Sequence, residues 1–284
     1  MVLWFFLALW TGPLAASDAV RTAAALERQA AERCRLGHCI EAERLQTQAL
    51  SRWEEAARTR PVDLAIPNAN LAQIYLATGK LTAAERHAEA AARLQAQSNA
   101  SAAEQARVIT LLAKIRFQQS RFSEAAELQE GVVRALEVPG ATGPGILAVA
   151  LNDLAMMQAA GGDLRRARTL LERSVAIHRR PSRTAEGGLG EVLGNLALVC
   201  VRQGDYRAAD PLYREAISTV EASLGPAHPH LGMLFAEHAK VLKKTDQKPE
   251  AKQAELRAKA ILGSATELAG RNAVDASALR RPRP

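Results

Sequence analysis

The feature that most constrains this chain is an alanine that recurs every 41 or 42 residues. Six alanines keep this register, with intervals of 42, 41, 42, 42 and 42 residues: Ala42, Ala84, Ala125, Ala167, Ala209 and Ala251. A further alanine precedes each of them by 12 residues: Ala30, Ala72, Ala113, Ala155, Ala197 and Ala239. Two series that hold one register over six units indicate an internal repeat, even in an alanine-rich chain.

A turn sequence separates the two alanines of each unit. The turns read LGHC, TGKL, QSRF, GGDL, QGDY and TDQK. In four of them a glycine stands where a helix C-terminus needs a residue that tolerates positive φ: Gly37, Gly79, Gly162 and Gly204. The flanking segments are rich in helix-forming residues, and no stretch alternates like a strand. We therefore expect an all-α fold of six helix–turn–helix units stacked into a solenoid.

One unit also resembles a known family. Residues 195–230, NLALVCVRQGDYRAADPLYREAISTVEASLGPAHPH, resemble a tetratricopeptide repeat (TPR) of the 42-residue kind found in kinesin light chains and in many bacterial proteins. The likeness lies in NLA, GDY, Ala-x-x-Leu-Tyr and the LG-x-x-HP tail, and residues 68–91 and 151–175 repeat it. The third unit departs by having Ser120 at its turn, and the end units are the most degenerate, as capping repeats are. The resemblance implies a right-handed α-solenoid.

The repeat register divides the chain into a leader, a solenoid and a tail. We expect the solenoid within residues 18–262, with repeats at about 23–58, 65–98, 103–138, 146–181, 189–224 and 230–262. After Leu262 the register is lost, and residues 263–284 are expected to form a C-terminal cap or a basic tail.

Residues 1–17, MVLWFFLALWTGPLAAS, contain no charged side chain and end in small residues after a Gly-Pro break. This layout is typical of a secretory signal peptide, although its basic n-region is missing, and the apolar run is short for a membrane span. We expect export to the periplasm or outside the cell, with no stable membrane span after the leader is removed. An uncleaved N-terminal anchor, or a cytoplasmic protein with a spurious leader, is the alternative.

Reactive motifs are scarce. No nucleotide-binding loop, catalytic triad or metalloprotease motif is present, so we expect no enzyme activity, no cofactor and no metal. His228 and His230 stand two residues apart and suggest a metal site at first sight. In the family resemblance His228 matches the linker histidine, most simply a turn residue bonding local backbone, so we interpret this stretch as a spacer between repeats.

Two cysteines, Cys34 and Cys39, flank the first turn. In an oxidising compartment a disulfide across that turn is sterically conceivable. The alternative is that both are small core residues of a capping repeat. Cys200 stands alone in the middle of a helix and is expected to be buried.

The remaining candidate site is the surface of the solenoid itself. In tetratricopeptide repeats the first helix of each unit lines the concave groove and carries an Asn that can hold a partner's backbone. Residues at i, i+3 and i+7 share a helix face. By this register the candidate groove residues are Asn70, Gln73, Lys114, Asn152, Asn195, Arg202, Lys240 and Lys244. The groove is expected to be more basic toward its C-terminal half, where Lys243 also lies; the alternative is that these cations form a solvated face.

The expected function is therefore a non-catalytic scaffold that binds a protein or peptide segment, with an acidic segment as one candidate, in the TPR groove. The net charge of +7 is spread among glutamates and aromatic residues make up 4% of the chain, so we expect no nucleic-acid partner. The alternative function is a small metal-binding protein or enzyme built on a helical scaffold. The sequence leaves the oligomeric state open.

Overall fold

The computed structural model describes residues 18–56, 61–98, 100–138, 143–180 and 188–278, with side chains as far as residue 264. The expected leader, residues 1–17, lies outside these ranges, as do residues 279–284 of the expected tail. The turn and linker residues 57–60, 99, 139–142 and 181–187 are likewise outside them.

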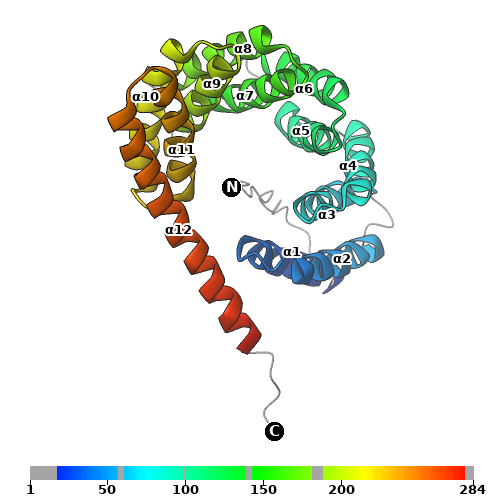
Figure 1. Ribbon diagram of the computed structural model, residues 1–284. Helices are drawn as coiled ribbons and strands as arrows, with labels where there is room; N and C mark the ends of the chain where they lie inside the picture. Colours follow the sequence, from blue (N-terminus) through cyan, green and yellow to red (C-terminus); the bar gives the residue numbers. More distant parts are fainter. Residues whose placement is uncertain (1–17, 57–60, 99, 139–142, 181–187, 279–284) are drawn as a thin grey trace. The chain divides into compact units, whose positions relative to one another are not determined.

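Within the described ranges the chain folds into twelve α-helices and a short 3₁₀ helix, without a strand (Figure 1). The expectation of an all-α fold is confirmed. The elements are α1 (Asp18–Arg35), α2 (Cys39–Ala56), η2 (Pro61–Leu64), α3 (Ala65–Ala77), α4 (Leu81–Ala96), α5 (Ala102–Gln118), α6 (Phe122–Leu136), α7 (Pro144–Ala160), α8 (Leu164–His178), α9 (Leu189–Arg202), α10 (Tyr206–Leu224), α11 (Pro229–Lys244) and α12 (Lys248–Ala278). The helix α12 continues beyond Leu262, so the repeat register ends before the helix does.

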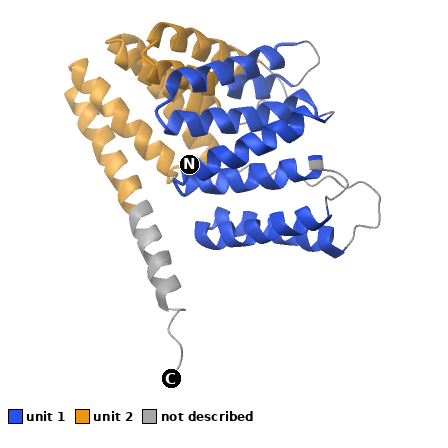
Figure 2. Ribbon diagram, turned by 90° about the vertical axis from the view of Figure 1, so that its right-hand side faces the viewer, with its two compact units in different colours: residues 1–150 blue, residues 151–284 orange. Residues whose placement is uncertain are grey.

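The helices group into two compact units, residues 1–150 and 151–284 (Figure 2). In the first unit α1 packs on α2, α3 on α4 and α5 on α6, and between hairpins α2 packs on α3 and α4 on α5. In the second unit α9 packs on α10 and α11 on α12, while α8 contacts α9 and α10 contacts α11. The helix α7 begins in the first unit and ends in the second.

Both alanine series lie in the core. All twelve of the alanines that define the repeat are at most 1% exposed. A methyl group is the largest side chain that allows two antiparallel helices to approach this closely, and the larger apolar residues around the alanines fill the space between hairpins. The alanines therefore recur in the sequence because helix packing requires a small side chain at these positions.

A third series of small residues, which the sequence analysis missed, keeps the same intervals. Its members are buried near the start of each first helix: Ala23, Ala65, Ala106, Ala148, Gly190 and Gly232. A Cβ atom added to Gly190 would lie 2.5 Å from Cγ2 of Val220 on α10. At this position the first helix approaches the second so closely that only small residues fit.

The six turns share one backbone geometry. The turn residues all have positive φ: Gly37, Gly79, Ser120, Gly162, Gly204 and Asp246. In every turn the next residue donates its N–H to the carbonyl five positions earlier at 2.8–2.9 Å, as Lys80 does to Tyr75. This is the Schellman ending of a helix, for which glycine is the favoured residue. Ser120 and Asp246 adopt it at φ 62° and 61°.

The first and sixth repeats carry charged residues where inner repeats bury apolar ones. Ile74 of α3 is fully buried, whereas Glu32 stands exposed at the same register in α1. Tyr213 of α10 is 1% exposed, whereas Glu255 stands exposed at its register in α12. Polar outer faces of this kind are typical of the repeats that end a solenoid.

Candidate functional site

The helix α9 leaves one narrow stripe of side chains accessible. Asn195 and Leu198 are half-exposed and Glu191 and Arg202 are exposed, whereas the residues between them are buried except Val201. Spacings of three and four residues place these side chains on one face of the helix. The two candidates that the sequence register gives on this helix, Asn195 and Arg202, therefore lie on an accessible face together with Leu198.

The helix α11 carries the corresponding stripe of the next repeat. Glu237, Lys240 and Lys244 are accessible, and α11 contacts α9 within the second unit. The ammonium of Lys240 lies 2.6 Å from the carboxylate of Glu237, one turn away on the same helix. Among the described residues, Arg202 and Lys244 have no hydrogen-bond or ion-pair partner, so their charges remain available. We call the accessible side chains of α9 and α11 the first-helix stripes.

Lys243 does not contribute a free charge, because its ammonium pairs with Glu255 of α12. In the first unit Gln73 is half-exposed on α3 and Lys114 is exposed on α5. These two residues thus lie on accessible faces of their helices, and their role in binding a partner stays a prediction.

Two of the eight candidate groove residues are buried at contacts between repeats, where the half-exposed Asn195 also makes a hydrogen bond. Asn70 is 5% exposed and donates to Oε1 of Glu27 at 3.4 Å, and Asn152 is 6% exposed and accepts a hydrogen bond from Asn195 at 2.9 Å. Both are covered by the neighbouring repeat, since the first helices lie side by side. We therefore remove Asn70 and Asn152 from the set of partner-binding candidates and assign them to repeat stacking.

The carboxylate of Glu27 was not singled out from the sequence. It is 7% exposed and accepts hydrogen bonds from Gln46 at 3.3 Å and from Asn70. Burial raises the pKa of Glu27, and the polar side chains of Gln46, Trp53 and Asn70 oppose that rise without cancelling it. An alignment of the repeats would have found Glu27, because it is the one charged residue at its register. The other five repeats have small or uncharged residues there: Ala69, Thr110, Asn152, Gly194 and Ala236.

Comparison with known proteins identifies the repeat. A sequence model described as tetratricopeptide repeat matches residues 147–180 and 190–230. These two segments are tetratricopeptide repeats. A comparison with curated protein sequences gave no significant match.

Solved structures show the same fold. BtubC (BKLC) from P. vanneervenii superposes with a TM-score of 0.63 at 19% identity, covering 94% of this chain and 95% of its own. The kinesin light chain TPR-like repeats of Podosopora anserina give a TM-score of 0.59 at 22% identity, covering 73% of this chain and 98% of their own. A Rap protein complexed with competence and sporulation factor gives 0.62 at 12% identity, covering 88% and 77%. TPR proteins are in general scaffolds without catalytic activity that have protein partners.

The histidine pair of the fifth TPR linker serves the turn. Nδ1 of His228 accepts the backbone N–H of His230 at 3.2 Å and so caps the start of α11. Burial lowers the pKa of His230. Within the part of the chain that the structure describes, no group of three His, Cys, Asp or Glu residues is arranged to hold a metal ion. The interpretation of His228 as a turn residue that bonds local backbone agrees with this geometry.

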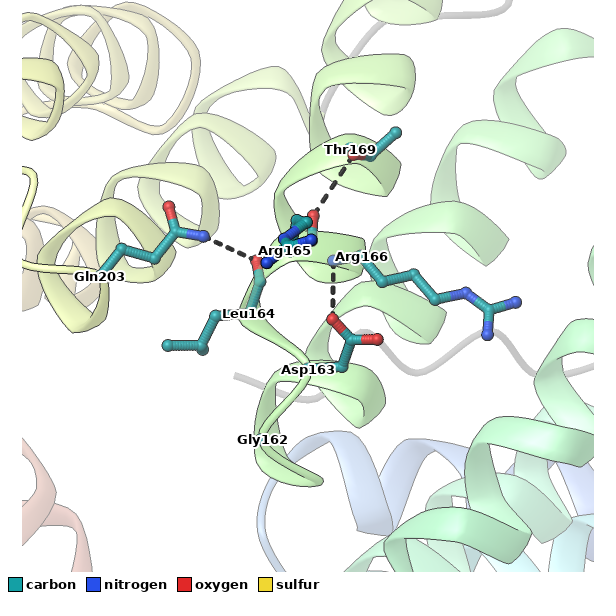
Figure 3. Close-up of a pocket in the computed structure, with 7 residues that line it drawn as sticks. All are labelled: Gly162, Asp163, Leu164, Arg165, Arg166, Thr169 and Gln203. Atoms are coloured by element: carbon teal, nitrogen blue, oxygen red, sulfur yellow. Dashed lines mark hydrogen bonds between the residues drawn. The ribbon is translucent and has the colours of Figure 1, made fainter.

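An open depression lies at the turn of the fourth TPR, and Figure 3 shows how its polar groups are used. The amide of Gln203 donates to the carbonyl of Leu164 at 3.1 Å, and the backbone N–H of Arg166 donates to Asp163 at 2.9 Å. A similar depression recurs around Gly204 in the next repeat. Because its polar groups bind one repeat to the next, we interpret the depression as a consequence of stacking.

None of the helices in the described ranges is long and apolar enough to span a membrane. The expected leader lies outside those ranges, so export stays a prediction.

Proposed function

We propose that this chain is a TPR scaffold that binds an acidic segment of a partner protein along the first-helix stripes of α9 and α11. The observation that carries the proposal is the pair Arg202 and Lys244. They stand 42 residues apart, at the same register of neighbouring helices, and neither is neutralised by another described residue. Cations that are already paired, such as Lys243, would have to break that contact before they could bind a partner.

The remaining side chains of the stripes suit an extended polypeptide. Asn195 is half-exposed beside its hydrogen bond to Asn152, and Leu198 offers a small apolar surface between the polar groups. Charge-assisted hydrogen bonds from Arg202 to carboxylates would add affinity and orientation. The Rap protein of similar fold was solved as a complex with competence and sporulation factor, which supports a ligand-binding role for such a scaffold.

The test is selection of peptide ligands from a displayed random library with the wild-type protein, followed by affinity measurements. We expect acidic sequences to be enriched, and the variant Arg202→Glu/Lys244→Glu to bind them at least about tenfold more weakly. The matched control is Arg134→Glu/Lys252→Glu, which makes the same change in net charge at exposed positions of second helices. Equal affinity of the stripe variant and the wild type would refute the proposal.

We further propose that residues 1–17 direct export of the protein. N-terminal sequencing of the mature protein recovered from the cell envelope or the medium tests this. A mature chain that begins near residue 17 or 18 supports it, and a cytoplasmic chain that retains Met1 contradicts it.

A further inference from the structure

Cys34 and Cys39 lie opposite one another across the first turn. Cys34 is in the last turn of α1 and Cys39 is the first residue of α2, and their sulfur atoms are 3.9 Å apart. Backbone hydrogen bonds fix the turn between the two cysteines. The N–H of His38 donates to the carbonyl of Arg33 at 2.8 Å, and the N–H of Gly37 donates to the carbonyl of Cys34 at 3.0 Å. A disulfide needs the sulfurs at about 2.05 Å, so the two side chains must move closer together when the bond forms.

The repeat register supports this pairing independently. Phe117 and Phe122 occupy the same two positions in the third repeat, and their rings meet edge to face with centroids 5.4 Å apart. The hairpin thus brings these two register positions into contact across the turn. In the first repeat both positions hold thiols, so a covalent bond can form where the third repeat has an aromatic contact.

The two thiols differ in access. Cys34 is 3% exposed and packs with Ala42 and with Ile74 of the second repeat. Cys39 is half-exposed, and its neighbour Ile40 is 85% exposed, so the approach from solvent is open. Burial and the adjacent Cys39 raise the pKa of Cys34 to about 12, so Cys34 is protonated at neutral pH.

We propose that Cys34 and Cys39 are the site of a reversible disulfide that locks the first hairpin. The oxidant is another disulfide, either a small molecule or a protein. The thiolate of Cys39 attacks one of its sulfurs, forming a mixed disulfide and releasing one thiol. Cys34 then loses its proton to solvent and attacks the sulfur of Cys39, which releases the second thiol. The pair has lost two electrons and two protons, and the oxidant has gained both as two thiols.

The lock would act on the end of the solenoid. The hairpin of α1 and α2 is the first repeat, and Cys34 contacts Ile74 in α3, so closing the pair stiffens the repeat that caps the first unit. Cys200, the third cysteine, is fully buried in α9 of the second unit and serves as an internal reference for a thiol without a partner.

The test is equilibration of the full chain in glutathione buffers of stepped oxidised-to-reduced ratio, followed by intact mass measurement and thiol counting. We expect the oxidised protein to lose two hydrogens, to keep one thiol, and to yield a crosslinked peptide of Cys34 and Cys39. Amide exchange in α1 and α2 should slow on oxidation and recover on reduction. Retention of all three thiols, or a lasting glutathione adduct on Cys39 in the wild type, would overturn the proposal.

Two variants separate the roles of the two thiols. Cys34→Ser should accumulate a stable glutathione adduct on Cys39, because the resolving thiol is missing. Cys200→Ser should form the disulfide as the wild type does. Failure of Cys200→Ser to close, with native circular dichroism, would contradict the assignment.

Discussion

One ion pair in each unit joins neighbouring repeats at the same register, and the two pairs have opposite polarity. In the first unit the acid stands on a second helix and the base at the next turn, as with Glu43 and Lys80, whose atoms are 2.7 Å apart. In the second unit Arg168 occupies the register of Glu43, and Asp205 that of Lys80, at 3.1 Å. Since the backbone positions correspond, the polarity of the pair is a free choice at each interface.

The polarity of the ion pair also affects the helix that starts at the turn. Asp205 is the N-cap of α10 and accepts the N–H of Ala208 at 3.1 Å, and this bond, followed by Arg168, lowers the pKa of Asp205. Lys80 has nearly the same backbone angles, φ −80° and ψ 62° against −86° and 67°, but its side chain cannot cap α4. One aspartate in the second unit therefore does two tasks, while the lysine in the first unit does one.

The two units also differ in the side chains that they bury between neighbouring repeats. In the first unit two buried glutamines at one register, Gln46 and Gln129, donate to backbone carbonyls of the next first helix at 3.3 and 3.2 Å. In the second unit that register holds Leu171 and Tyr213, which are almost fully buried. At this register, therefore, two repeats of the first unit contribute buried hydrogen bonds to the next repeat, and two repeats of the second unit contribute apolar or aromatic side chains.

The largest expected effect concerns the third small-residue series, which is alanine in the first unit and glycine in the second. Gly190→Ala should lower the free energy of unfolding by about 2 kcal/mol, because the added methyl collides with Val220. Gly131→Ala on α6 is the control: nothing lies within 4 Å of its added Cβ, so it should gain about 1 kcal/mol in helix propensity. Urea denaturation measures the free energy of unfolding of both variants. If Gly190→Ala were more stable than the wild type, α9 and α10 could move apart without loss of stability, and the explanation would fail.

The next effect tests the ion-pair polarity directly. Giving the first unit the polarity of the second, with Glu43→Arg/Lys80→Asp, should raise the free energy of unfolding by about 1 kcal/mol, because the introduced aspartate would cap α4. Glu43→Arg alone should lower it by about 0.5 kcal/mol through repulsion of Lys80. A double-mutant cycle in thermal unfolding gives the coupling; if the cycle closes with zero coupling energy, the pair does not fasten the repeats.

A smaller gain is expected at the turns. Ser120→Gly should stabilise the protein by roughly 0.8 kcal/mol, because Ser120 holds φ at 62°, where glycine carries no Cβ penalty. Asp246→Gly is the matching change in the second unit, at φ 61°. Amide hydrogen exchange should slow in α5 and α6 for Ser120→Gly, and in α11 and α12 for Asp246→Gly. Faster exchange in either variant would contradict the assignment of strain.

The polar contact of the first unit should also make its stability depend on pH. Since the folded-state pKa of Glu27 is raised, the folded protein retains a proton there to higher pH than the unfolded chain, and stability falls as pH rises from about 4.5 through that pKa. Glu27→Gln, which keeps the acceptor for Asn70, should therefore be more stable than wild type at pH 7. The two proteins should converge below pH 4.5, and a gap that does not change with pH would sink this explanation.

The sequence by itself determined the repeat, the helical hairpins and the turn positions. The alanines of the two series and the four turn glycines are visible because helix packing and positive φ restrict residue type at fixed intervals. The accessible stripe of α9 also followed from helical periodicity. The interpretation of His228 as a turn residue came from its match to the linker histidine in the family resemblance.

Only the tertiary structure decided which polar residues face a neighbour. Asn70 and Asn195 share one face of their helices in the repeat register, yet Asn70 is buried against Glu27 while Asn195 stays half-exposed. Periodicity gives a side chain's face, but its partner depends on the side chain that the adjacent repeat supplies. The same holds for Lys243 and Lys244, adjacent in sequence, of which Glu255 neutralises only the first. Charge compensation is a property of the folded neighbourhood, so the free cations could be identified only after the repeats were stacked.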